Sequence, residues 1–400
     1  MNPAPKTKHA LLSLIAGASL AATLPASATP LAILFVGNSY TFSRVDPAMS
    51  YNAAAVHDLT ARFNAISSTG SNPWEPHPWG GIAGIFKQMT VEAGLDYDVS
   101  LSARNGVSLR GHFLNTANTV WDLRGNIASR KWDVVVLQEQ SDATLPPGKG
   151  KNANPAQFRA YANQLEAFIH TGAAQDYTET VLYGSMAACQ ATGQSQPQCE
   201  TRRRIAVNPH ANAQARVYLT QTWARPDMVY PHWLTVSDNA SPDGRRIVDS
   251  SPAGSAATLY YPTLSAMTRD LHDANCAAAR ANAHFFGIVA VGAAFQRAFD
   301  QAVIKTSGFY DADGRYSIAQ PGEPMNLWWD DYLHSSKYGS YLDALVQFGT
   351  ITGRDPLTLG AGETAARDLG ITPAQTQTLQ RIASEQLAAA SGTMPGSCSL

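Results

Sequence analysis

Residues 31–41 read LAILFVGNSYT, an unbroken apolar run that ends in Gly-Asn-Ser. A short apolar run bounded by a turn signal is typical of a buried strand in a parallel sheet. We therefore predict a strand over 31–36, with Gly37 permitting a tight turn and Ser39 lying in that turn. Ligands bind beyond the carboxyl ends of the strands in open α/β sheets. Ser39 is therefore a candidate nucleophile, provided that a base reaches its hydroxyl.

Outward from this stretch, strand and helix patterns alternate through most of the chain. Further strands are predicted over 96–102, 134–137, 180–184, 216–220 and 286–291, and helices over 82–95, 156–170, 264–283, 294–302, 340–352 and 373–390. This alternation predicts an α/β fold in which a mostly parallel central sheet is covered by helices on both faces, a three-layer α/β/α sandwich. Segments rich in Pro, Gly, Asn and Ser near 41–80, 186–210 and 226–262 are interpreted as loop insertions around one core.

The N-terminal residues have the pattern of a secretory signal peptide. Lysines precede an apolar stretch over 10–24, which is followed by Ala26-Ser27-Ala28. A positive region, a short apolar run and a small-x-small cleavage site are what a secretion signal requires, and the run is too short to span a bilayer comfortably. We predict a signal peptide over 1–28 and a single mature domain over 29–400 that is secreted or periplasmic.

Export gives the four cysteines of the chain a structural interpretation, because disulfides persist in oxidising compartments. Cys189 and Cys199 bracket a short polar loop, which favours a local disulfide between them. Cys276 and Cys398 would then tie the C-terminal tail to a helix. The alternative is that these are buried or free thiols.

The charge of the chain is balanced and sparse, with a formal net charge of -2 and 15% charged residues. It gives no reason to expect a nucleic acid or an anionic membrane as partner. Arg202-Arg203-Arg204, the most conspicuous charge run, is interpreted as a solvated loop. His57 and His77 lack a second ligand at a recognisable spacing and no CxxC pair exists, so no metal site is predicted. No segment after residue 28 is long and apolar enough for stable membrane insertion.

Residues 328–336, WWDDYLHSS, place Asp331 and His334 three positions apart, just before a predicted helix. At this spacing a carboxylate reaches the Nδ1–H of the imidazole, which leaves Nε2 free to accept a proton from a serine. Asp330 is the competing carboxylate. His112 and His232 are alternative bases or substrate contacts, although a structural role is favoured for both.

Together, the Gly-Asn-Ser turn and the Asp-x-x-His motif resemble the SGNH (GDSL-like) hydrolases, a family defined by four sequence blocks. Candidates for the two middle blocks occur in order, as Asn105-Gly106-Val107-Ser108 after the second predicted strand and Leu137-Gln138-Glu139-Gln140-Ser141 after the third. The resemblance implies a flavodoxin-like fold, a catalytic triad of Ser39, Asp331 and His334, and no metal or organic cofactor.

The resemblance also implies an oxyanion hole made by the backbone N–H groups of Ser39 and Gly106 and by a side-chain amide from the third block. The family usually has Gly-x-Asn-Asp in that block. Here the amide would come from Gln140, with Gln138 as the alternative.

The activity that the resemblance implies is ester hydrolysis, by a carbohydrate O-acetylesterase or a short-chain carboxylesterase acting on a small-molecule or glycan ester. Carbohydrate is named because aromatic rings near a cleft can stack on sugars, although they can equally pack loops onto a core. The rings concerned are those of Trp74, Trp79, Trp233, Trp328 and Trp329. A glycan-binding protein without turnover is one alternative. A lipase or phospholipase is another, but 41–80 and 226–262 contain no evident amphipathic lid helix.

Overall fold

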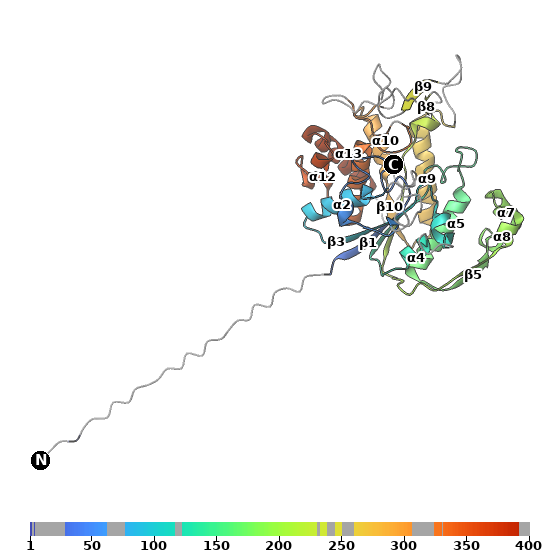
Figure 1. Cartoon of the computed structure of the whole chain (residues 1–400), viewed down its shortest axis with the longest axis horizontal. Coiled ribbons are helices and arrows are strands. Elements are labelled where there is room, and N and C mark those ends of the chain that lie inside the picture. The colour runs from blue at the N-terminus through green and yellow to red at the C-terminus, as the bar shows by residue number, and fades with distance from the viewer. Residues whose placement is uncertain are drawn as a thin grey trace.

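A computed structural model describes residues 29–61, 77–116, 122–229, 260–305, 324–329 and 331–391, besides Met1, Ala4 and the backbone of two strands at 233–237 and 245–249. Figure 1 shows strands at the centre of the molecule with helices around them. The predicted signal peptide, apart from Met1 and Ala4, lies outside the described residues, as does Cys398. None of the helices in the described part of the chain is both long and apolar enough to cross a membrane.

The centre of the fold is a six-stranded sheet with the order β10-β7-β4-β1-β3-β2, and every neighbouring pair in it is parallel. Its strands are β1 (Leu31–Gly37), β2 (His57–Asp58), β3 (Tyr97–Ala103), β4 (Val134–Gln138), β7 (Arg216–Thr220) and β10 (Phe285–Val289). The predicted α/β/α class is confirmed. The predicted central strands begin and end within a few residues of those observed, except the one over 180–184.

Alternate residues of the strands enter two separate apolar cores, because successive side chains of a strand point to opposite faces. In β1, Ile33 and Phe35 join the core under α2 (Gly81–Glu92), α10 (Val291–Asp300), α11 (Lys337–Thr352), α12 (Thr364–Asp368) and α13 (Pro373–Ser391). Leu34 and Val36 join the core under α3 (Leu109–Leu114), α4 (Leu123–Ile127) and α5 (Pro155–His170). The long helix α9 (Leu264–Ala281) supplies residues to both cores. Burial on both faces explains why β1 reads as an unbroken apolar run.

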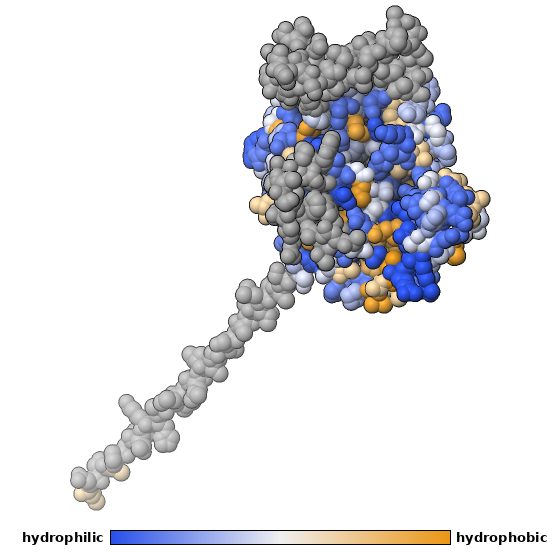
Figure 2. All heavy atoms as spheres, turned by 45° about the vertical axis from the view of Figure 1, so that its right-hand side comes forward, coloured by the Kyte–Doolittle hydropathy of each residue, from blue (hydrophilic) through white to orange (hydrophobic). Residues whose placement is uncertain are grey.

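A small lobe projects beside α5 in Figure 1 and is mostly hydrophilic in Figure 2. It contains an antiparallel pair, β5 (Gln175–Thr178) and β6 (Arg202–Ile205), and the short helices α6 (Glu179–Leu182), α7 (Met186–Ala191) and α8 (Gln196–Glu200). The Cys189–Cys199 disulfide joins α7 to α8, so this predicted pairing is confirmed. The predicted partner of Cys276 is Cys398, which lies outside the described residues.

Two sequence interpretations within this lobe are wrong. The strand predicted over 180–184 is the helical turn α6, which Thr178 caps by accepting a hydrogen bond from the Val181 N–H. Its apolar run misleads because Val181 is 71% exposed whereas Glu179 is buried. The arginine run, interpreted as a solvated loop, is strand β6; Arg202 pairs with Asp176 across the strands.

The described residues of the insertions include short elements of secondary structure. Residues 53–55 form a 3-10 turn, Ala53–Ala55, and a second turn, Pro226–Met228, precedes an antiparallel pair of strands, β8 (Trp233–Ser237) and β9 (Arg245–Asp249). A third 3-10 turn, Pro356–Leu359, links α11 to α12. Within the described residues, the insertion segments thus add secondary structure to the central sandwich, and of their strands only the two-residue β2 joins its sheet.

Candidate active site

Ser39, His334 and Asp331 form one hydrogen-bonded chain. Ser39 lies in the turn after β1, and its Oγ is 2.8 Å from Nε2 of His334. The other ring nitrogen, Nδ1, lies 2.6 Å from Oδ2 of Asp331. A carboxylate can only accept at Nδ1, so Nδ1 carries the ring proton and Nε2 is the acceptor for the serine hydroxyl.

The turn that carries Ser39 is held by its neighbour Asn38. The Asn38 carbonyl accepts from the N–H groups of Thr41 and Phe42, and its side-chain Oδ1 accepts from the Tyr40 N–H at 3.1 Å. The side-chain amide of Asn38 donates to the Val107 carbonyl at 3.0 Å. The asparagine of the Gly-Asn-Ser motif therefore shapes the turn and ties it to the loop after β3.

Asp331 is locked into a tight loop before α11. Its Oδ1 accepts from the backbone N–H groups of Leu333 and His334, at 3.0 and 2.9 Å. Tyr332, the residue after Asp331, has φ of 57°, a left-handed conformation that is uncommon for a residue with a side chain. Burial by itself would raise the pKa of Asp331, but the positive charge of His334 and the hydrogen bonds from His334 and Leu333 hold that pKa below its usual value. Asp331 is therefore ionised at neutral pH and can orient the imidazole.

Asp330, which competed with Asp331 in the sequence, lies outside the described residues, as does His232. His112 is fully buried, and its Nε2–H donates to the Gly37 carbonyl at 2.8 Å. Burial lowers the pKa of His112 to about 4, so the ring is neutral and supports the end of β1. This is the structural role that the sequence favoured.

The predicted oxyanion donor Gly106 lies in the turn after β3, with φ of 64°. A residue with a side chain would be strained in this conformation. A Cβ atom placed there would meet nothing within 4 Å, so the turn faces open space. The Asn38–Val107 hydrogen bond joins this turn to the Ser39 turn.

The two glutamines of the third block have different environments. Gln138 is 4% exposed, and its Oε1 accepts from the Asn38 N–H at 3.2 Å and from the Thr41 hydroxyl at 2.9 Å. Its Nε2 donates to the Glu139 carbonyl. Gln140 is half-buried, and within the described residues its side-chain amide has no hydrogen-bond partner. Gln138 is thus committed to the fold, whereas the predicted role of Gln140 as an oxyanion donor stays a prediction.

Glu139, between them, is a buried carboxyl that the sequence analysis missed. Its Oε1 accepts from the N–H of Gln140 at 2.7 Å and from the N–H of Leu109, the first residue of α3, at 3.2 Å. Burial raises the pKa of Glu139 to about 7, against the lowering effect of these two bonds. Glu139 joins the loops after β3 and β4, which contain the two candidate oxyanion donors.

As a test of the predicted oxyanion role, Gln140→Ala is expected to lower kcat for ester hydrolysis about 10²-fold, the typical effect of losing one such donor, and to leave Tm unchanged. Gln138→Ala is the contrast: it leaves the Asn38 N–H and the Thr41 hydroxyl unsatisfied in the interior and should reduce stability by about 1–3 kcal/mol. Steady-state kinetics and thermal unfolding of both variants test this. A wild-type kcat in Gln140→Ala would remove Gln140 as a donor.

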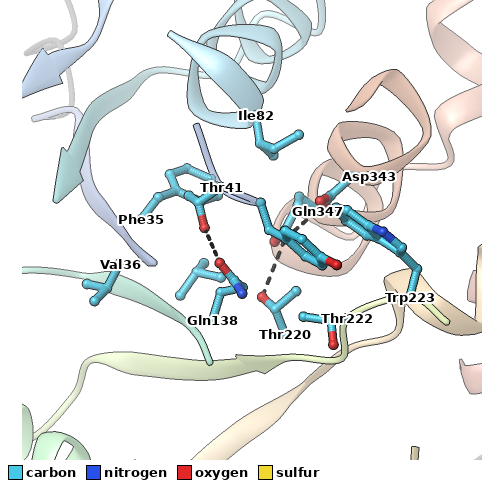
Figure 3. Close-up of a pocket in the computed structure, with 12 residues that line it drawn as sticks. Phe35, Val36, Thr41, Ile82, Gln138, Thr220, Thr222, Trp223, Asp343 and Gln347 are labelled. Atoms are coloured by element: carbon cyan, nitrogen blue, oxygen red, sulfur yellow. Dashed lines mark hydrogen bonds between the residues drawn. The ribbon is translucent and has the colours of Figure 1, made fainter. Parts of the chain in front are cut away.

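A small cavity lies between the sheet and α11, beneath the Ser39 turn (Figure 3). Its volume of about 10 Å³ is close to that needed by a single water molecule. Asp343 of α11 lines it and is 3% exposed. Its Oδ1 accepts a hydrogen bond from Gln347 at 3.2 Å, but burial raises its pKa to about 7. This acid, like Glu139, holds its proton up to neutral pH in the folded protein.

These two raised pKa values predict a pH dependence of stability. Between about pH 4, where an unfolded carboxyl releases its proton, and about pH 7, these two carboxyls keep protons in the folded chain that they release in the unfolded chain. Their contribution to the free energy of unfolding therefore falls as the pH rises through this window and levels off above it. Asp343→Asn should remove the contribution of Asp343: it should match the wild type near pH 4 and exceed its stability at pH 8 by about 4 kcal/mol. Urea unfolding at both pH values measures this, and equal stability of the two proteins at pH 8 would contradict it.

Two of the five tryptophans considered as sugar-stacking rings pack in the core. Trp79 is fully buried and stacks on Phe42 with 3.9 Å between ring centroids, and Trp328 is 2% exposed. Trp329 is half-buried, while Trp74 and the Trp233 side chain lie outside the described residues. Packing is thus the role of Trp79 and Trp328.

The histidines considered as metal ligands pair with carboxylates instead: His57 with Asp98 at 3.0 Å, and His77 with Asp58 at 2.7 Å. In the part of the chain that the structure describes, no three or more His, Cys, Asp or Glu residues are grouped to hold a metal ion.

Comparison with known proteins gives structural likeness at low identity. The chain is similar to a protein from Slackia heliotrinireducens described as an SGNH hydrolase (16% identity, TM-score 0.35, covering 80% of this chain and 99% of that one). It is also similar to a DUF4886 family protein from Bacteroides uniformis (13% identity, TM-score 0.40, covering 90% of this chain and 95% of that one). A third similar structure is phospholipase A1 from Streptomyces albidoflavus (12% identity, TM-score 0.32, covering 80% of this chain and 99% of that one). No protein-family model and no curated protein matches the sequence. At these identities the likeness concerns the overall fold and says nothing of substrate or activity.

Proposed function

We propose that this chain is a secreted serine esterase that hydrolyses carboxylic esters through an acyl-enzyme on Ser39. The observation that carries the proposal is the continuous contact from Ser39 Oγ to His334 Nε2, at 2.8 Å, and from His334 Nδ1 to Asp331 Oδ2, at 2.6 Å. Nucleophile, base and orienting carboxylate within hydrogen-bonding reach are the geometric signature of an activated serine.

In the proposed mechanism His334 removes the proton from Ser39 as its Oγ attacks the ester carbonyl. The tetrahedral oxyanion is stabilised by the backbone N–H groups of Ser39 and Gly106 and by the side-chain amide of Gln140. His334 then protonates the leaving alcohol, which leaves an acyl group on Ser39. Water attacks this acyl-enzyme with His334 again as base, which releases the acid and restores the serine. Asp331 keeps the imidazole in the productive tautomer and stabilises its protonated form.

The same geometry weighs against a glycan-binding module without turnover. A binding module has no need to bring Ser39 and His334, which are 295 positions apart in the chain, to hydrogen-bonding distance. In addition, Asp331 is held ionised and accepts from Nδ1 of His334, which orients the imidazole as a base requires.

Among carboxylic esters, we propose that the substrate has a small acyl group, on either a carbohydrate or a simple alcohol.

The Cys189–Cys199 disulfide supports export of the chain, because such bonds persist in oxidising compartments. Mass spectrometry of the exported protein should find a mature N-terminus near Thr29.

The test is hydrolysis of p-nitrophenyl esters of increasing acyl length, together with acetylated xylan, by the mature protein. Activity on acetyl esters that falls as the chain lengthens, with acetate released from xylan, supports a carbohydrate O-acetylesterase. Acetyl ester activity without action on xylan supports a short-chain carboxylesterase. Activity that rises with acyl length would replace both by a lipase, and no hydrolysis of any ester would overturn the proposal.

A further inference from the structure

Trp223, in the segment after β7, contacts both halves of the candidate catalytic site. It is 1% exposed, and its ring stacks on that of Tyr40 with 4.0 Å between centroids and 3° between planes. Its indole N–H donates to the Leu333 carbonyl at 3.0 Å. Tyr40 directly follows Ser39 and Leu333 directly precedes His334, so one rigid side chain contacts the neighbour of the nucleophile and the neighbour of the base.

The position of Trp223 is itself secured. Its ring also stacks on Phe295 of α10, at 4.9 Å and 7°, and Phe295 meets Trp328 edge-on at 5.8 Å. The Trp328 indole N–H donates to the carbonyl of Ala224, the residue after Trp223, at 3.1 Å. Figure 3 shows Trp223 at the side of the cavity beneath the Ser39 turn, near Asp343. A side chain held by rings and hydrogen bonds has little freedom to move, which suits it to transmit a fixed spacing.

We propose that Trp223 is a positioning residue that sets the separation between Ser39 Oγ and His334 Nε2; this inference rests on the proposed esterase function. The two reacting groups come from opposite ends of the chain, and proton transfer needs them within about 2.6–3.2 Å of each other. Tyr40 extends the arrangement to the base, because its ring lies edge-on to the His334 imidazole at 5.9 Å. In this role Trp223 acts through Tyr40 and Leu333 and does not touch the substrate's reacting atoms.

A merely structural role is the competing explanation, and Trp132 is the matched control for it. Trp132 is also buried, at 2% exposure, and its indole N–H also donates to a backbone carbonyl, that of Ile127, at 2.7 Å. It belongs to the core on the opposite face of the sheet. Trp132→Phe and Trp223→Phe each keep an aromatic ring and delete one such hydrogen bond, so they should cost similar stability.

Steady-state hydrolysis of p-nitrophenyl acetate by the mature protein and both variants is the first readout. Trp223→Phe should lower kcat about 10- to 100-fold with KM within about twofold of the wild type, because misplacement of reacting groups by a fraction of an ångström to 1 Å has effects of this size. Trp132→Phe should retain the wild-type kcat. Equal kcat in the two variants would overturn the proposal.

The second readout does not depend on turnover. The Nδ1–H proton shared by His334 and Asp331 should give a downfield proton NMR signal. This signal should move or broaden beyond detection in Trp223→Phe and stay in place in Trp132→Phe. An unchanged signal in Trp223→Phe would overturn the positioning role. Absence of Ser39-dependent hydrolysis in the wild type would instead overturn the esterase proposal, and the NMR signal would still decide the role of Trp223.

Discussion

Replacing Ser39 with alanine is expected to lower ester hydrolysis about 10⁴-fold or more, because the nucleophile of the acyl-enzyme is removed and only binding and the oxyanion donors remain. The one hydrogen bond described for the hydroxyl is to His334, so its loss should leave the fold intact. The measurement is kcat/KM for p-nitrophenyl acetate, with thermal unfolding of both proteins as the control.

Matching Tm values with abolished hydrolysis would support Ser39 as the nucleophile. Hydrolysis by Ser39→Ala at the wild-type rate would exclude it. If Ser39→Ala loses activity and also has a much lower Tm, Ser39→Gly and Ser39→Cys are compared instead. Of these two, only the cysteine variant can still form an acyl intermediate.

Asp331→Asn is expected to lower kcat about 10³- to 10⁴-fold with little change in KM. Asparagine has nearly the same shape, but its amide can donate to Nδ1 and so favours the wrong tautomer of His334, and it cannot stabilise the imidazolium. The carboxylate concerned makes three contacts in the loop, to the ring and to two backbone N–H groups. Steady-state kinetics with p-nitrophenyl acetate measures the effect.

The neighbouring carboxylate is the matched control. Asp330→Asn changes the same charge one position earlier in the chain and should keep kcat within about threefold of the wild type. A large loss in Asp330→Asn with little loss in Asp331→Asn would reverse the assignment of the orienting carboxylate.

The central fold could be predicted from the sequence because its strands are buried on both faces and read as apolar runs. β1, β4 and β7 followed this rule, and the helices around them showed apolar residues at helical spacing. The small lobe did not follow it. Its strands β5 and β6 are mostly polar, with Ile205 as the one residue of β6 in the apolar core, and ion pairs and a disulfide add to its stability.

The candidate site likewise contains some residues that the sequence could single out and others that it could not. Ser39, Asp331 and His334 could be singled out as candidates because each lies in a short motif of recognisable residue types, and the structure brings the three side chains together. The sequence left Gln138 and Gln140 as alternatives, because only burial and hydrogen-bond partners distinguish them. The contacts of Trp223 to Tyr40 and Leu333 could not be predicted, because they arise from tertiary structure.

The most direct test of the central claim is covalent labelling of the mature protein with a fluorophosphonate, followed by intact-mass spectrometry and peptide mapping. The proposed esterase mechanism predicts one phosphonyl group per chain, attached to Ser39, with labelling slowed strongly in Asp331→Asn and absent in Ser39→Ala. An unlabelled wild-type protein, or a label on a residue other than Ser39, would contradict the account.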